Sequence, residues 1–445
     1  MHIKTLTAQN FRCFENLQID FQPGFNLLIG NNMSGKTAVL DALRVCIYRY
    51  VNQLYSDEIE LQKKDTRMIR YCSGDSIDMV KQYPVRIQCE VIFDGSLGAK
   101  LSGTPVSTLP GSILNTCGQS MKIGNDGEQL SQIGDIEFSG QRVRGGLTVG
   151  DIEPPIVSFY GTNRNNLPVG DSEELRQIIP KTFTRQYGYA HCLSYLSSLP
   201  MIRSWIERRT MSEMQRKQRG LPLLEEGPLL GIERAVKICL PELKQFYFDF
   251  EFQELTAVFQ DDRRLPWMML SDGMRSLISL AMDIAWRAVV LNPQLGANAP
   301  ELATGIVMID ELDLALHPTW QRRIVGDLSR AFPNLQFIAT THSPQIIGSA
   351  KNALVQKIDG DKVQTVAHPF GLDSNTLLTE VMGAKERDPA IVKLFDEVTA
   401  LMNDKRWDEA RAALARVTDQ IDSLDTEVVS LRARIDFLSR AVTRS

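Results

Sequence analysis

The chain has 445 residues, of which 43% are hydrophobic and 23% are charged, a balance typical of globular proteins. Its formal net charge of -5 gives no overall indication of nucleic-acid binding and leaves a local basic face as the open alternative. The seven scattered cysteines form no CxxC pair, so neither a disulfide framework nor a zinc site is indicated. With no membrane-spanning apolar run and no signal peptide, we expect a cytoplasmic protein.

Predicted strands and helices alternate along most of the chain. In the first part, hydrophobic periodicity predicts strands at residues 2–9, 17–29, 83–94 and 156–161, with a Gly/Ser/Thr-rich excursion at 95–150. Residues 171–243 have helical spacing. The remaining core elements are a strand at 245–262, a helix from about Met274, a strand at 305–309, a helix at 318–332 and a strand at 335–340. This alternation predicts an α/β layered domain.

Three apolar helical stripes follow in residues 385–445. The stripes are separated at Asn403-Asp404 and near Ser423-Asp425, which suit helix ends. The sequence therefore predicts a three-helix tail. Its stripes pack either on the parent domain or against a partner, with Trp407 and Phe437 as core residues in the first case and partner contacts in the second.

A glycine-rich loop lies between a predicted strand and a predicted helix. It matches the phosphate-binding pattern GxxxxGKT, and its candidate nucleotide contacts are Gly30, Asn31, Asn32, Ser34, Gly35, Lys36, Thr37 and Ala38. Backbone N–H groups in such a P-loop surround phosphate oxygens, and an ordinary turn is the disfavoured alternative. We expect Lys36 to reach the β- and γ-phosphates of ATP and Thr37 to bind Mg²⁺. Met33 stands where this class of loop usually carries glycine, which predicts altered loop geometry or weaker binding.

Two carboxylates follow the apolar strand at 305–309, as in a Walker B motif. Asp310 is expected to hold Mg²⁺ through water, and Glu311 to act as the general base on the attacking water. His342 follows the next strand, where it can approach the γ-phosphate and orient that water. A lone histidine at a strand end is more often structural, but its position behind this pair of motifs favours the catalytic role.

The string Leu270-Ser271-Asp272-Gly273 precedes an apolar helix. It is similar to the LSGGQ signature of ABC ATPases, with Asp272 in place of the first glycine. The resemblance implies that Ser271 and Gly273 close onto ATP bound by a second copy, in a head-to-head dimer with two composite sites. Taken alone, the same string is also compatible with a simple helix N-cap.

Two further strings resemble chromosome-maintenance and RecF-like ATPases. Residues 314–318, LALHP, are similar to their D-loop. Arg12 in NFRCF is similar to the arginine that precedes their P-loop, which implies a position near the nucleotide, the alternative being a solvated arginine. Arg164 in YGTNR is a second candidate of this kind.

Together the motifs resemble the ABC-type ATPases of the RecF/SMC/OLD-like branch. The resemblance implies an α/β ABC-type P-loop ATPase head with an inserted helical lobe and a C-terminal helical tail. The expected parts are the N-terminal half of the head with the P-loop and a β-rich lobe (1–170), the helical insertion (171–244), the C-terminal half with the signature, Walker B and histidine switch (245–384), and a tail for oligomer or partner contact (385–445). No nuclease site is predicted, and Asp359-Gly360-Asp361 is interpreted as a hairpin turn.

Longer strings, including NFRCFENLQIDF, ELDLALHPTWQRRI and FPNLQFIATTHSPQII, resemble bacterial antiphage-defence ATPases, above all the PtuA family of Septu systems. That family works with a separate HNH nuclease, PtuB. The resemblance implies a slow, ATP- and Mg²⁺-dependent regulatory ATPase that forms dimers or higher oligomers and gates an HNH nuclease partner.

The alternative hypothesis is a RecF-like DNA-repair ATPase that binds DNA directly. Its support is a basic stretch at 203–219, made of Arg203, Arg208, Arg209, Arg216, Lys217 and Arg219. Such a run is more often a solvated helical face. A third hypothesis, a scaffold with inactive sites, is disfavoured because Lys36, Asp310, Glu311 and His342 are all present, although Met33 keeps it open.

Overall fold

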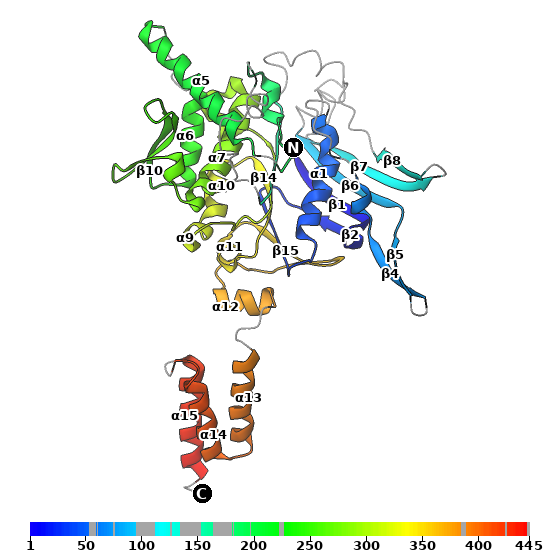
Figure 1. The fold of residues 1–445 in the computed structure, drawn as a ribbon, viewed down its shortest axis with the longest axis vertical. Coiled ribbons are helices and arrows are strands. Elements are labelled where there is room, and N and C mark those ends of the chain that lie inside the picture. The colour runs from blue at the N-terminus through cyan, green and yellow to red at the C-terminus, as the bar shows by residue number, and fades with distance from the viewer. Residues whose placement is uncertain are drawn as a thin grey trace. The chain divides into compact units, whose positions relative to one another are not determined.

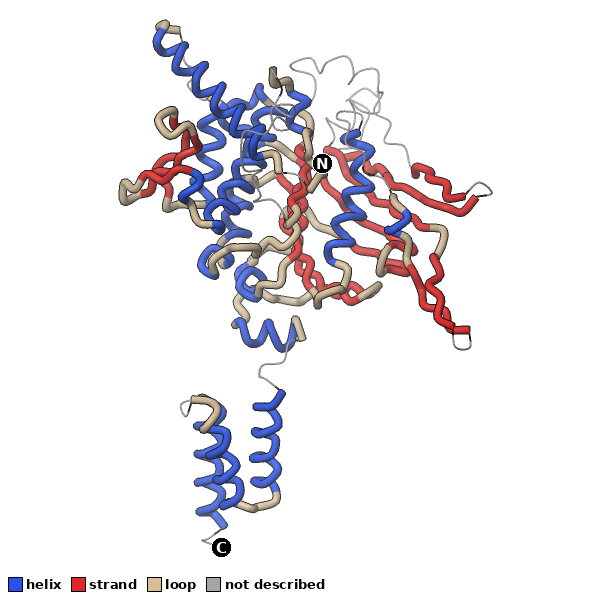
Figure 2. Tube along the Cα trace, viewed as in Figure 1, coloured by secondary structure: helices blue, strands red, loops and turns tan. Residues whose placement is uncertain are grey.

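The computed structural model describes residues 1–52, 59, 61–73, 76–94, 112–124, 127–133, 153–162, 180, 182–195, 197–221, 227–383, 389–422 and 425–442. They belong to two compact units, Met1–Leu377 and Leu378–Ser445. Figure 1 labels the elements, and Figure 2 separates helices from strands by colour. Arg164, one of the arginines considered above, lies outside the described residues.

A six-stranded sheet forms the centre of the larger unit, in the order β16-β15-β3-β14-β13-β9. Its strands are β3 (Phe25–Ile29), β9 (Ile156–Tyr160), β13 (Gly305–Ile309), β14 (Leu335–Thr340), β15 (Leu354–Asp359) and β16 (Lys362–Thr365). Neighbours pair in parallel except β15 and β16, which form an antiparallel hairpin around Gly360. The hairpin turn predicted at Asp359-Gly360-Asp361 is therefore confirmed. Strands β3, β9, β13 and β14 are buried along their whole length, as expected of a sheet covered on both faces.

A second, antiparallel sheet has the order β2-β1-β6-β7-β8. Its strands are β1 (His2–Phe11), β2 (Phe14–Asp20), β6 (Val85–Asp94), β7 (Ser112–Gly124) and β8 (Gly127–Ile133), beside a separate hairpin of β4 (Met68–Ser73) and β5 (Ser76–Lys81). The prediction of one strand at 17–29 is wrong. The chain leaves this sheet after β2 and enters the parallel sheet at β3, through a turn in which Gly24 has φ 82°, a conformation that glycine adopts readily.

Helix α1 (Lys36–Asn52) follows the P-loop and contacts β6 and β7 of one sheet and β14 of the other. Among the described residues of the larger unit, the other helices are α5 (Leu199–Gln218), α6 (Pro228–Cys239), α7 (Asp272–Leu291), α8 (Ala299–Leu302), α9 (Pro318–Gln321), α10 (Ile324–Ala331), α11 (Pro344–Ser349) and α12 (Ser374–Thr376). Helix α7 is buried over nearly its whole length and contacts β9 and α6. The single helix predicted at 318–332 is two helices, because the chain breaks at Arg322–Arg323.

A small three-stranded sheet contains β10 (Leu243–Asp249), β11 (Glu254–Phe259) and β12 (Arg264–Pro266). The prediction of one strand at 245–262 is therefore wrong. The strand is folded back on itself at a turn in which Gln253 has φ 53°. Alternation of apolar and polar residues continues on both sides of this turn, which hid it in the sequence.

The smaller unit contains α13 (Pro389–Asn403), α14 (Trp407–Thr418) and α15 (Thr426–Val442), so the predicted three-helix tail is confirmed. Its apolar stripes pack on one another in a core that includes Val398, Val417 and Val428, all 0% exposed. Trp407 packs against this core, whereas Phe437 is 74% exposed. No helix among the described residues is long and apolar enough to cross a membrane. The two sheets, their helices and this tail confirm the predicted α/β class with a C-terminal helical region.

Candidate nucleotide site

Three adjacent parallel strands end beside one another and carry the motifs from both halves of the sequence. The P-loop follows β3, His342 follows β14, and Asp310 follows β13, and the carboxyl ends of parallel strands lie at one edge of their sheet. A single pocket at this edge is lined by Arg12, Cys13, Asn32, Met33, Gly35, Lys36, Thr37, Ala38, Asp310, Glu311, Thr340 and His342. Residues about 270 positions apart in the sequence thus form one site.

The P-loop is a tight turn that needs its two glycines. Gly30 has φ 152° and Gly35 has φ 99°. A Cβ atom on Gly30 would lie 2.4 Å from the carbonyl oxygen of Ile358, and one on Gly35 would lie 2.4 Å from the ring of Phe14. Met33 has φ 67°, in the left-handed region that favours glycine, so the loop keeps a glycine-like backbone with a methionine in it.

Lys36 and Ser34 supply the polar groups inside the loop. The Lys36 ammonium donates to the carbonyl oxygens of Gly30 at 3.0 Å and Asn31 at 2.9 Å. Burial lowers the pKa of Lys36, while the nearby Asp310 carboxylate acts in the opposite direction. The Ser34 hydroxyl is buried and has no hydrogen-bond partner among the described residues. An unpaired buried hydroxyl and a buried cation fit a bound polyphosphate, which supplies acceptors to both.

Thr37 and Asp310 converge on one point beside the loop. The Thr37 hydroxyl lies 3.1 Å and 3.2 Å from the two carboxylate oxygens of Asp310. Thr340 donates to the same carboxylate at 2.7 Å, and the Asp310 N–H donates to the carbonyl of Tyr160 at 2.8 Å. Hydroxyl and carboxylate oxygens are ligands that Mg²⁺ prefers, so these residues fit the metal of a nucleotide complex. A Mg²⁺ ion held by these residues would neutralise charge on the phosphate oxygens.

Glu311 is held by its backbone in an unusual conformation. Its φ is 50°, which is costly for a residue other than glycine and is found mainly at functional sites. Its N–H donates to the Thr340 hydroxyl at 2.8 Å. Because that hydroxyl in turn donates to Asp310, Thr340 fixes both acids at once. Thr340 was not among the predicted site residues, since its only signal in the sequence is its place at the carboxyl end of a predicted strand.

The loop that carries His342 is tied to the segment after Glu311. The Asp313 carboxylate accepts from the Thr341 hydroxyl at 2.6 Å and from the His342 N–H at 3.2 Å. Ser343 then caps α11 by accepting from two N–H groups of its first turn. The half-buried His342 side chain consequently lines the pocket from a fixed backbone. Asp313 is a second anchoring residue that sequence analysis did not identify.

Arg12 lines the pocket but is bound by acidic side chains of its own chain. Its guanidinium pairs with Asp65 at 2.9 Å and with Asp41. Burial acts to lower the pKa of Arg12, and the two carboxylates outweigh it and raise that pKa. Asp41 also pairs with Arg44 and accepts from the Tyr195 hydroxyl at 3.0 Å. Arg12 is therefore not a solvated arginine, and its guanidinium is oriented by α1, the helix that follows the P-loop.

The signature residues lie in a different groove of the same chain. Ser271 caps α7 by accepting from the Met274 N–H at 3.4 Å, so the N-cap interpretation is also realised. A Cβ atom on Gly273 would lie 2.6 Å from the carbonyl oxygen of Ala315, which packs the signature against the D-loop-like segment. The groove is lined by Ser271, Gly273, Ala315, Leu316, His317, Thr319 and Trp320. It shares no residue with the P-loop pocket.

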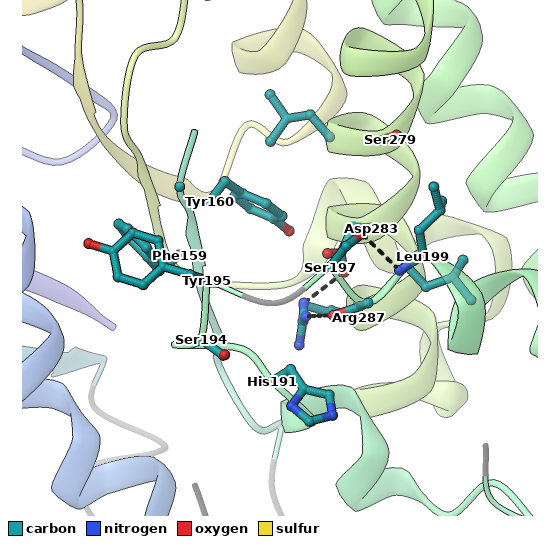
Figure 3. Close-up of a pocket in the computed structure, with 14 residues that line it drawn as sticks. Phe159, Tyr160, His191, Ser194, Tyr195, Ser197, Leu199, Ser279, Asp283 and Arg287 are labelled. Carbon is teal, nitrogen blue, oxygen red and sulfur yellow. Dashed lines mark hydrogen bonds and ion pairs between the residues drawn. The ribbon is translucent and has the colours of Figure 1, made fainter. Parts of the chain in front are cut away.

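A buried polar cluster joins α7 to the strand beside Asp310 (Figure 3). Arg287 is 1% exposed, and its Nε atom lies 2.8 Å from Asp283. It also donates to the carbonyl of Gly188 at 2.8 Å and the hydroxyl of Ser198 at 2.7 Å. The ring of Tyr160 points toward Asp283. Burial raises the pKa of the Tyr160 hydroxyl and of the Asp283 carboxyl. This cluster could not be predicted from the sequence, because its members come from β9, from residues 188 and 198, and from α7.

Two family models match the chain. A model described as an AAA domain matches residues 5–186. A second AAA-domain model, whose description also names the AbiEii toxin of type IV toxin–antitoxin systems, matches residues 212–348. The chain is an AAA-domain ATPase. The two matches cover the P-loop and the Walker B segment, respectively.

Relatives of this AAA-domain ATPase include three bacterial groups. The "Retron Ec83 probable ATPase" of Escherichia coli is 22% identical over 98% of this chain and 87% of its own length. The Septu protein PtuA of Bacillus mycoides strain KBAB4 is 32% identical over 37% of this chain and 23% of its own. The replication and repair protein RecF of Lachnoclostridium phytofermentans is 34% identical over 18% of this chain and 22% of its own. The predicted resemblance to PtuA is thus confirmed over about a third of the chain.

Among solved structures, the SMC head domain from Thermotoga maritima is 14% identical and has a TM-score of 0.42, covering 82% of this chain and 98% of that domain. This likeness is too weak to add to the fold. The assignment of the fold rests on the order of the central strands and on the P-loop between β3 and α1.

Proposed function

We propose that this AAA-domain ATPase is the ATP-binding and ATP-hydrolysing regulatory subunit of an antiphage-defence complex. The observation that carries the proposal is the convergence of Lys36, Thr37, Asp310 and Glu311 around one pocket. Homology to a retron ATPase along nearly the whole chain, and to PtuA along part of it, supports the defence role.

In the proposed mechanism the P-loop N–H groups and the start of α1 hold the phosphates of ATP. Lys36 leaves its two carbonyl partners to bind the β- and γ-phosphates, and Thr37 and Asp310 hold the Mg²⁺. Glu311 accepts a proton from the attacking water, and His342 orients that water from the neighbouring strand end. Turnover is slow, because a regulatory switch depends on the lifetime of each nucleotide state.

The site is completed by a second copy of the chain. Ser271 and Gly273 line a groove separate from the P-loop pocket of their own chain, so they reach a nucleotide only across a dimer. In a head-to-head dimer the α7 N-terminus of each copy faces the phosphates held by the other, where its N–H groups favour negative charge. ATP then stabilises the dimer, and hydrolysis releases it.

The output of this switch is the control of a partner nuclease of the HNH class, similar to PtuB. The helical tail supports this part of the proposal, because its core is internal and its exposed Phe437 is left available for a contact with an oligomer or a partner. We place the complex in the cytoplasm, where ATP is abundant and the five free cysteines described in the structure stay reduced.

The test is the mass distribution of the Glu311→Gln protein by mass photometry, with and without Mg²⁺ and ATP. We expect ATP to shift this variant to a dimer or higher oligomer and to leave Lys36→Ala unchanged. Affinity purification with the products of the flanking genes, followed by mass spectrometry, tests the partner. Recovery of an HNH protein in fixed stoichiometry supports the gating role, and recovery of the ATPase with DNA alone contradicts it.

A second candidate function, direct binding of DNA, is favoured by helix α5. Its C-terminal half projects from the helical layer (Figure 1), and Lys217 and Arg219 are exposed there. Against it, Arg203 donates to a backbone carbonyl and Arg209 pairs with Glu213 at 3.6 Å. DNA binding through this helix would weaken steeply with salt, and a flat response of measured affinity to salt excludes it.

A further inference from the structure

Met33 combines two unfavourable features at the mouth of the nucleotide pocket. Its backbone is left-handed at φ 67°, and its side chain is 97% exposed. A left-handed backbone is costly for a residue with a Cβ atom, and an apolar side chain in water contributes nothing to folding. Strain of this kind persists mainly where a function needs it. The turn itself does not need the Met33 side chain, because glycine would adopt this backbone at a lower cost.

A second exposed apolar spot lies next to the signature. Met268 and Met269 are 57% and 70% exposed, at the end of the short 3-10 helix Trp267–Met269. The residues on either side, Trp267 and Leu270, are 4% and 3% exposed. These buried neighbours fix the turn and hold the two methionines outward, two residues before Ser271. This spot is therefore presented by a rigid segment.

The two spots lie beside the two halves of the composite site. Met33 precedes Lys36 by three residues in the P-loop, and Met269 precedes Ser271 by two. A dimer that brings the signature of one copy onto the phosphates held by the other brings these methionines to the same edge. The twofold symmetry of such a dimer makes the contact twice.

We propose that Met33 packs against Met268 and Met269 of a second copy of the chain and closes the rim of the ATP site. This inference rests on the proposed head-to-head dimer. Methionine suits the role, because its flexible thioether chain adapts to a partner surface that forms and separates. The contact removes apolar surface from water and shields the phosphates from solvent in the ATP-bound dimer.

The test measures dimerisation and ATP binding separately in a Glu311→Gln background. Met33→Gly removes the side chain and relieves the left-handed strain, so the protomer stays folded. Losing two apolar contacts per dimer predicts a dimer dissociation constant in Mg²⁺ and ATP raised by roughly tenfold to a hundredfold. Binding of a fluorescent ATP analogue to monomers at low protein concentration is measured in the same variant, so that a change in nucleotide affinity is separated from the loss of the dimer contact. The matched control is Met211→Ala, which removes a methionine 52% exposed on α5 and leaves the dimer constant unchanged.

A cross-linking arm identifies the contact itself. Met33→Cys with Met269→Cys is prepared in a Cys13→Ser background, because Cys13 is exposed beside the loop. We expect a short bismaleimide to join two chains in the presence of ATP and Mg²⁺ and not in their absence. If Glu311→Gln dimerises with ATP but Met33→Gly dimerises equally well and no cross-link forms, the contact is refuted and the dimer stands. If Glu311→Gln stays monomeric, the dimer itself is refuted, and the contact with it.

Discussion

Replacing Arg287 with methionine removes the cation from the buried cluster of Figure 3 at nearly constant side-chain volume. Asp283 then keeps a carboxylate in an apolar environment without its partner, which costs about 3–5 kcal/mol for a broken buried pair. The carbonyl of Gly188 and the hydroxyl of Ser198 also lose a donor, at about 1–3 kcal/mol for each group left unpaired. Because these effects overlap, we expect the free energy of unfolding to fall by about 4–6 kcal/mol.

The loss has a predicted dependence on pH. Burial raises the pKa of Asp283, and Arg287 opposes that rise, so the variant raises this pKa further. A folded-state pKa above the unfolded value means that the folded protein binds more protons, and stability then falls as pH rises between the two values. The free energy of unfolding of the variant is therefore closest to that of the wild type at mildly acidic pH. The difference is largest above the raised pKa of Asp283.

The assay is urea denaturation followed by fluorescence and circular dichroism at several pH values. Asp283→Leu combined with Arg287→Met removes both charges and is expected to cost less than Arg287→Met alone. The control is Lys4→Met, which breaks an exposed 3.3 Å pair with Glu90 and is expected to cost under about 1 kcal/mol. The reasoning is refuted if Arg287→Met lowers the free energy of unfolding by less than about 1 kcal/mol. It is also refuted if the loss in the double variant equals the sum of the losses in the two single variants.

Three further predictions concern the pocket. Lys36→Ala is expected to abolish ATP binding measured by calorimetry, whereas the control Lys351→Ala, at an exposed lysine, is expected to keep it. Equal ATP affinities of the two variants would contradict the P-loop assignment. Thr340→Val leaves ATP binding in place but lowers the hydrolysis rate by roughly tenfold to a hundredfold, because Asp310 and the backbone of Glu311 lose their shared hydroxyl. Thr340→Ser restores the rate, and a Thr340→Val enzyme of normal rate contradicts this role. Burial raises the pKa of the Cys13 thiol, so we expect its alkylation to be slow at neutral pH and to speed up as the pH rises past the usual thiol range. Mg²⁺ and ATP are expected to block this alkylation, and a rate that nucleotide does not change would contradict the place of Cys13 in the pocket.

The sequence predicted best where a pattern depends on neighbouring residues. The strand that became β13 and the helix that became α1 flank motifs whose spacing is local, and both lie where periodicity put them. The hairpin at Asp359-Gly360-Asp361 followed from turn chemistry in the same way. The three tail helices also formed as predicted, because each apolar face was complete within one helix, whereas the packing of their stripes on one another was neither of the two arrangements expected.

Predictions failed where two elements share one pattern or where contacts are distant. Residues 17–22 alternate and residues 25–29 are mostly apolar, so both halves have strand character, and the turn at Gly24 that moves the chain from one sheet to the other was not recognised. Thr340 and Asp313 act through hydrogen bonds to groups on a neighbouring strand or loop. Arg12 lines the P-loop pocket, but the two carboxylates that hold it, on α1 and at residue 65, were not predicted. Pairings of this kind are set by tertiary structure, and no spacing in one sequence encodes them.

The central claim is that each ATP site is shared by two copies of the chain, and complementation between two inactive variants tests it most directly. Lys36→Ala disables a P-loop and Ser271→Arg disables a signature, so a mixed dimer retains one intact site made of the remaining halves. We predict that each variant alone hydrolyses no ATP and that an equal mixture recovers about a quarter of the wild-type rate, since half the dimers are mixed and each has one working site. A mixture as inactive as its components would contradict the shared site.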